Sequence, residues 1–199
     1  EFLCGNRPCE IIDARAEKFY DIVVEHPKPG LNDFEIAKKL LVMPNVAWCM
    51  NRMKELIEQS KSTIIFVNTR ETAESLGSRF KVWLPDFKIA VHHSSLSKDV
   101  RIDVEDKFKN GELKAIIATS SLELGIDIGR VDLVIQYGSP RQVTKLVQRV
   151  GRSGHGIGRV SKGIVLCSTV DDYIEATSIL EKIKTKWIED PGIQEEPFD

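Results

Sequence analysis

The sequence lacks any long run of apolar residues. No stretch approaches the roughly 18 residues that a membrane-spanning helix needs, and the segment 64–67 is typical of its apolar runs. The first residues (EFLCGNRPCE) hold no basic region followed by an apolar stretch, so the sequence predicts no signal peptide. An initiator methionine is also absent, and we expect the chain to be a piece of a longer protein.

Paired or clustered cysteines are lacking as well. The four cysteines are scattered, without CxxC spacing and without a matching group of histidines. This pattern predicts a reduced, cytoplasmic protein with no structural zinc site. The chain also shows no internal repeat and no low-complexity tract.

The overall charge gives little indication of a partner, but its distribution does. The formal net charge is only −2. Residues 130–162 nevertheless hold seven Lys or Arg against one acid, whereas residues 163–199 hold three Lys against nine acids. A local basic surface in a nearly neutral chain is an electrostatic signature of an anionic partner such as nucleic acid.

Regular alternation of strands and helices begins at residue 62. Before it, residues 9–25 are predicted as two short strands around a polar turn, and 33–41 and 46–59 as helices. After it, predicted strands lie at 63–67, 87–91, 114–118, 132–136 and 163–167. Predicted helices lie at 71–82, 98–109 and 171–186, and a further helix within 139–158 is expected to start near Pro140. Short apolar strands alternating with helices predict an α/β fold: an open, mainly parallel sheet with helices on both faces. We expect 1–61 to be a connecting segment, 62–187 the α/β domain, and 188–199 an acidic tail.

The segment 139–158 (SPRQVTKLVQRVGRSGHGIG) carries the basic residues of most interest. Apolar residues recur there at positions 143, 146, 147 and 150, the spacing of one buried helix face. At about 100° per residue, Gln148, Arg149 and Arg152 are predicted on the opposite face. Guanidinium groups match phosphate oxygens with parallel hydrogen bonds, so the segment is either a phosphate clamp or an exposed basic helix end.

Polar residues follow several of the predicted strands. They are Asn68, Thr69 and Arg70; His92, His93 and Ser94; and Thr119, Ser120 and Ser121. The carboxyl ends of parallel strands meet at one edge of a sheet, where ligands bind. The spacing of Ser120 and Glu123 also fits a helix-capping box. Taken with the arginine segment, these groups favour a shared ligand that carries phosphate.

Read together, the motifs resemble a known family. They are STIIFVNTRETAESL (62–76), VHHSSLSKDVR (91–101), KAIIATSSLELGIDIGRVDLVIQYGSP (114–140) and QRVGRSGH (148–155). In this order they resemble the second RecA-like domain of superfamily 2 helicases, and most of all the Lhr (large helicase-related) group of DNA helicases.

The resemblance implies roles for particular residues. Thr69, Arg70 and Thr119 would hold the backbone phosphates of one nucleic-acid strand, with His93 and Ser94 near it. Gly125 and Asp127 would face ATP. Gln148, Arg149 and Arg152 would meet its γ-phosphate, with Arg152 as the arginine finger. Many relatives end the last motif with arginine, whereas this chain has His155, which is mostly neutral near pH 7.

Two motifs of a complete motor are lacking. The chain contains no GxxxxGK[ST] loop and no DExH-type acidic box. The resemblance therefore implies that ATP and Mg²⁺ are bound mainly by a first, N-terminal RecA-like domain outside this chain, and that the chain alone does not hydrolyse ATP. The expected track is single-stranded or partly duplex DNA. An RNA track, or a non-enzymatic module that binds single strands or a protein, remain the alternatives.

A metal site is not expected. His92 and His93 are adjacent at the end of a predicted strand, where successive side chains point to opposite faces of the sheet, and no third ligand has suitable spacing.

Overall fold

The computed structural model describes residues 19–123, 128–154, 160–185 and 187 of the chain. In chain order the elements are β1 (Phe19–Glu25), α1 (Leu31–Leu40), α2 (Pro44–Gln59), β2 (Thr63–Phe66), α3 (Arg70–Trp83), β3 (Ile89–His92), α4 (Lys98–Lys109), β4 (Ala115–Ala118), the short 3₁₀ helix η1 (Ser120–Leu122), β5 (Leu133–Tyr137), α5 (Val143–Val150), β6 (Val160–Leu166) and α6 (Val170–Lys184). Each helix and strand predicted after residue 33 has a counterpart in this series.

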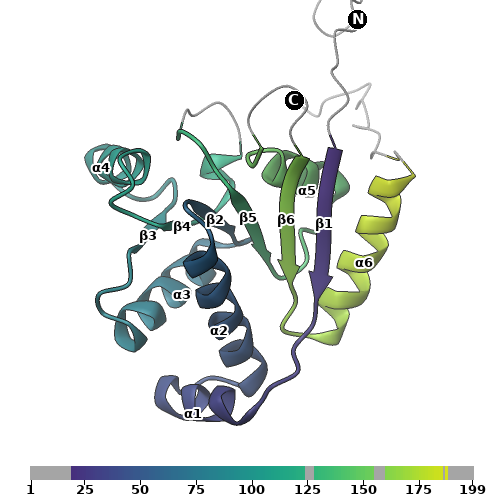
Figure 1. Cartoon of the computed structure of the whole chain (residues 1–199), viewed down its shortest axis with the longest axis horizontal. Coiled ribbons are helices and arrows are strands. Elements are labelled where there is room, and N and C mark those ends of the chain that lie inside the picture. The colour runs from purple at the N-terminus through teal and green to yellow at the C-terminus, as the bar shows by residue number, and fades with distance from the viewer. Residues whose placement is uncertain (1–18, 124–127, 155–159, 186, 188–199) are drawn as a thin grey trace, which may run out of the picture.

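The strands form one sheet in the order β1-β6-β5-β2-β4-β3, and each pairing between neighbours is parallel (Figure 1). This arrangement confirms the predicted α/β fold with a parallel sheet. Strands β2 and β4 lie inside the sheet, and every residue of both is buried. A strand that is covered on both faces needs a continuous apolar run, which is what the sequence provides at these two places.

Helices cover both faces of the sheet. Successive strand residues point to opposite faces, and accordingly Ile65 and Ile117 pack with α1, α2 and α3, whereas Ile64 and Ile116 pack with α4, α5 and α6. In Figure 1, α6 stands beside β1 at one end of the sheet and α4 beside β3 at the other. The two apolar layers hold the strand ends in fixed positions.

The segment before residue 62 is part of the same packing unit. Strand β1 pairs with β6 along its full length, from Phe19 to Glu25. Helices α1 and α2 contribute Ile36, Met50 and Met53 to the core on one face of the sheet. Residues on both sides of position 61, such as Ile57 and Ile65, therefore belong to the same apolar cluster. The first of the two strands predicted within 9–25, and the tail 188–199, lie outside the described residues.

Helix α5 differs in one respect from its prediction. Val143, Leu146 and Val150 are buried as expected, and Gln148 is exposed, but Arg149 is buried as well. The helix ends at Val150, so Arg152 lies beyond its last turn. The predicted placement opposite the buried face was therefore wrong for Arg149, and for Arg152 it depended on a longer helix than the one observed. At about 100° per residue, Arg149 lies at the flank of the buried face, from which a long side chain reaches inward.

Candidate functional site

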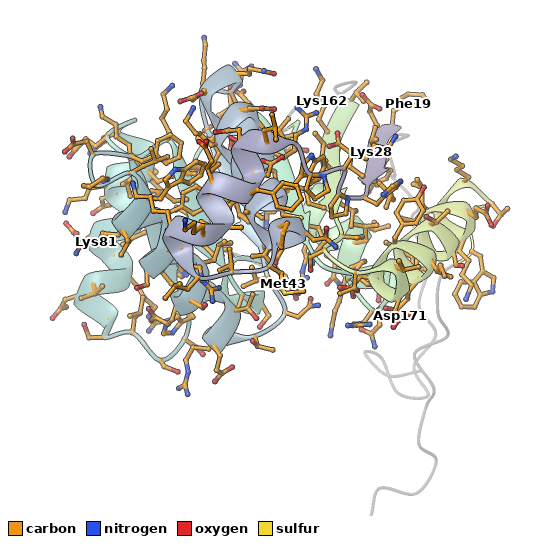
Figure 2. All side chains as sticks on the ribbon, turned by 90° about the horizontal axis from the view of Figure 1, so that it is seen from below. Phe19, Lys28, Met43, Lys81, Lys162 and Asp171 are labelled. Atoms are coloured by element: carbon orange, nitrogen blue, oxygen red, sulfur yellow. The ribbon has the colours of Figure 1, made fainter. Side chains whose placement is uncertain are left out.

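The polar residues that follow the strands meet at the carboxyl edge of the sheet, as the parallel topology requires. Strands β1 and β6 point toward this edge, which is at the bottom of Figure 1 and faces the viewer in Figure 2. Residues 67–69 follow β2, 93–97 follow β3, 119 follows β4 and 138–142 follow β5. The Arg149 side chain reaches this edge from α5, because its guanidinium binds Asn68 just after β2. Arg152 lies in the turn after α5, where the Gly154 N–H binds the carbonyl of Val131 just before β5.

Arg149 lies at the centre of a buried network. Its guanidinium donates from Nε to Glu123 Oε1 at 2.7 Å, and its Nη2 lies 2.6 Å from the same oxygen. Its Nη1 donates to Asn68 Oδ1 at 3.0 Å and to Gln136 Oε1 at 2.6 Å. The guanidinium also lies over the ring of Phe66, with 5.4 Å between its central carbon and the ring centroid. Arg149 is only 3 % exposed, so its charge is directed into the protein.

Arg152 is placed differently. It lies in the turn after α5, is half-buried, and donates from Nε to the backbone carbonyl of Glu123 at 3.1 Å. Partial burial lowers the pKa of Arg152 from its ordinary value, because the charged form loses solvation. An arginine keeps its charge at neutral pH despite such a decrease. Arg152 is thus a positioned cation that is still partly accessible to solvent.

Several of the residues predicted to bind a strand lie close together. Arg70 is exposed, and its Nη1 donates to Ser95 Oγ at 3.1 Å, which links the segment after β2 to the segment after β3. Thr69 caps α3 by accepting the backbone N–H of Thr72 at 3.2 Å. Ser94 is exposed and Thr119, after the intervening strand β4, is half-buried. These residues line one stretch of the carboxyl edge, over the neighbouring strands β2, β4 and β3.

His93 is not on that surface. It is 4 % exposed, and its Nε2 lies 2.6 Å from Glu74 Oε1 of α3. His92 is fully buried, with Nδ1 2.9 Å from Ser121 Oγ and Nε2 2.9 Å from Glu105 Oε1 of α4. The two rings are therefore held from opposite faces of the sheet. Among the described residues, no group of three His, Cys, Asp or Glu side chains could hold a metal ion.

Three partners of Arg149 were not recognised from the sequence. Glu123 was predicted to close a capping box with Ser120; instead η1 has Thr119 at its N-cap without a side-chain hydrogen bond, and the Glu123 carboxylate binds Arg149. That prediction was wrong because a buried cation is a stronger partner for a carboxylate than a backbone N–H. Gln136 gave a usable signal: a polar residue inside an apolar strand needs a buried partner.

Gly125, Asp127 and His155 lie outside the described residues, so the structure gives no position for them. Gln148 is exposed on α5. Within the part of the chain that the structure covers, no helix is both long and apolar enough to cross a membrane.

Comparison of the sequence with known proteins shows which proteins the chain is similar to. Residues 48–156 match the helicase conserved C-terminal domain. The chain is 41% identical, over 98% of its length, to 22% of the ATP-dependent helicase Lhr-Core of Sulfolobus acidocaldarius, and 45% identical, over 74% of its length, to 17% of the Lhr-Core protein 2 of Thermococcus barophilus. It thus spans about a fifth of these curated relatives.

A solved structure gives the same result. The helicase Lhr of Mycobacterium smegmatis, bound to single-stranded DNA and AMP-PNP, superposes with a TM-score of 0.80 at 36% sequence identity, over 96% of this chain and 25% of that one. The RecA-like fold that the motifs implied is thereby confirmed. The chain belongs to the helicase conserved C-terminal domain family of superfamily 2 and is similar to the Lhr helicases.

Proposed function

We propose that the chain is the second motor domain of a longer ATP-dependent helicase or translocase, which moves on DNA. A first RecA-like domain outside this chain would bind ATP, and the surface of this chain that holds Arg152 would close over the nucleotide. The observation that carries the proposal is the setting of Arg152: a charged, partly accessible guanidinium, held by the backbone carbonyl of Glu123 next to the buried Arg149 pair.

In this proposal the two arginines have different roles. Arg152 is the arginine finger, which stabilises the charge on the transferring phosphoryl group and is worth a factor of about 10³–10⁵ in rate. Arg149 holds neighbouring residues of the site in place and does not contact the nucleotide, because its donors already bind protein oxygens. Gln148 is exposed beside them and would contact the nucleotide directly, as would Gly125 and Asp127. Support comes from the Lhr relative, which binds the ATP analogue AMP-PNP.

Mg²⁺ is assigned to the first domain. There it would be held together with the phosphates of ATP.

The nucleic-acid strand would cross the edge over β2, β4 and β3. Thr69, Arg70, Ser94 and Thr119 offer hydroxyl and guanidinium donors there, which suit backbone phosphates. His93 would support this surface through Glu74 rather than touch the strand, since it is buried. Because phosphate contacts do not distinguish DNA from RNA, the choice of DNA rests on the Lhr relative bound to single-stranded DNA.

The decisive experiment measures ATP hydrolysis by the full-length protein, with and without single-stranded DNA or RNA. We expect stimulation by DNA, and we expect Arg152→Ala to abolish most turnover while strand affinity stays within about twofold, because a finger acts on the transferring phosphate. Arg130→Ala is the matched control. Arg130 is also an exposed arginine, and its guanidinium pairs with Asp132 just before β5.

Each alternative has its own outcome. Stimulation by RNA alone would move the track to RNA. The absence of ATP hydrolysis with either nucleic acid would favour a non-catalytic binding module. Loss of strand binding with normal turnover in Arg152→Ala would reverse the assignment of that residue. The 199-residue chain by itself is expected to show no ATP hydrolysis.

A further inference from the structure

Glu123 contacts both arginines of the site, and it does so with different atoms. Its carboxylate binds the guanidinium of Arg149 at 2.7 and 2.6 Å. Its backbone carbonyl accepts the Nε–H of Arg152 at 3.1 Å. The side chains of Arg149 and Glu123 are only 3% and 10% exposed, so the contact between them is made in a largely water-free environment.

The contact with Arg149 fixes the position of Glu123. A charge-assisted pair in which two N–H groups address one carboxylate has a narrow geometry. Arg149 is in turn fixed by Asn68, just after β2, and by Gln136, within β5. Through this chain of contacts, the carbonyl of Glu123 is tied to two strands inside the sheet, although Glu123 itself lies in a loop after η1.

We propose that Glu123 is a positioning residue for Arg152. Its carboxylate, clamped by Arg149, holds the backbone so that its carbonyl aims the guanidinium of Arg152 toward the phosphate. The inference rests on the proposed function, in which Arg152 is the finger. A finger acts only when it is correctly placed, and misplacement by about 1 Å can cost about 10²-fold in rate.

The expected effect is on turnover and not on binding. In the full-length protein, Glu123→Gln should lower the kcat of DNA-stimulated ATP hydrolysis by about 10- to 100-fold. The KM for ATP and the affinity for single-stranded DNA should stay within about twofold, because the remaining binding contacts are unchanged. Glu25→Gln is the matched control: Glu25 also receives two guanidinium bonds, from Arg52 Nε at 2.8 Å and Nη2 at 2.9 Å, and Arg52 belongs to α2, which covers the opposite face of the sheet from α5. The kcat of the Glu25→Gln variant should match that of the parent protein.

A double-mutant cycle separates positioning from a merely structural role. Lysine carries its donors only at the end of the side chain, so Arg152→Lys removes the Nε–H that binds the Glu123 carbonyl but keeps a positive charge. We expect Glu123→Gln to lower kcat by less than about twofold in the Arg152→Lys background, a strong departure from additivity. An equal fold loss in both backgrounds, or no loss in the parent, would overturn the inference.

Folding of the variant is tested in parallel. If Glu123→Gln does not fold, as judged by its thermal melt, Glu123→Asp replaces it in the same cycle, because aspartate keeps the charge while moving the carboxylate by one methylene. Where both variants fold, Glu123→Asp should lower kcat less than Glu123→Gln does. Like Glu123→Gln, it should do so only in the background that keeps Arg152. A failure of the proposed function would look different: Arg152→Ala would then hydrolyse ATP at the parental rate, whatever the result at Glu123.

Discussion

Replacing Arg149 tests whether this residue supports the domain. In Arg149→Ala, the largely buried Glu123 carboxylate loses its cation, and breaking a buried pair in this way costs about 3–5 kcal/mol. Gln136, which is fully buried, also loses the donor to its Oε1, while Asn68 is exposed and can bind water instead. Since these losses belong to one network and are not additive, we expect a decrease of about 4 kcal/mol in the free energy of unfolding.

Urea denaturation of the chain, followed by circular dichroism, measures this decrease. With a slope of about 2.5 kcal/mol per molar urea, the midpoint should fall by about 1.6 M. Arg52→Ala is the control, because its pair with Glu25 is more exposed (29% and 23% of the side chains). We expect that variant to lose less than about 1 kcal/mol. Equal midpoints for the two variants would refute the assignment of Arg149 as a buried support.

Two further predictions concern the strand surface and the buried thiols. Arg70→Ala should reduce the slope of log affinity for single-stranded DNA against log salt by about 0.7, since one phosphate contact is lost. Fluorescence anisotropy at several salt concentrations measures this slope, with Arg130→Ala as the control. An unchanged slope would place the strand elsewhere. Burial raises the pKa of Cys49 and of Cys167 to about 12. Because both folded pKa values lie above the unfolded value, the free energy of unfolding should decrease as the pH rises from about 9 to 12. The thiols of Cys49 and Cys167 should also resist a thiol reagent at pH 8.5 until urea unfolds the chain. Rapid reaction of either thiol in the native state would contradict this prediction.

The architecture was predictable because the apolar pattern encodes it directly. The continuous runs at Thr63–Phe66 and Ala115–Ala118 could only be strands covered on both faces, and strands alternating with helices force parallel pairing. The membership of β1 in the sheet was less predictable. Its residues alternate between exposed and half-buried, as expected for an edge strand, and its partner β6 is more than 130 residues away along the chain.

The candidate site was predictable in outline only. The parallel topology brings the strand ends together, so Thr69, Arg70 and Thr119 could be expected at one edge. The partners of Arg149 could not be expected in the same way: Glu123 is 26 positions away and Asn68 is 81 positions away. A periodicity argument places a residue on a helix face, but it cannot say that a long side chain on the flank of that face finds oxygen atoms from distant segments.

The buried network also allows stability and turnover to be separated. Buried ion pairs can often be replaced by apolar residues of similar volume without loss of stability. We therefore expect the triple variant Glu123→Leu, Arg149→Met, Gln136→Leu to regain most of the stability that Arg149→Ala loses, with a urea midpoint within about 0.5 M of the parent. The backbone carbonyl of residue 123 would remain, but without the clamp on its side chain. If the network serves only to hold the domain together, the triple variant in the full-length protein should hydrolyse ATP at the parental rate. If it serves to place Arg152, the same stable variant should show a kcat at least tenfold lower, because the charge of the finger is retained and its position is not.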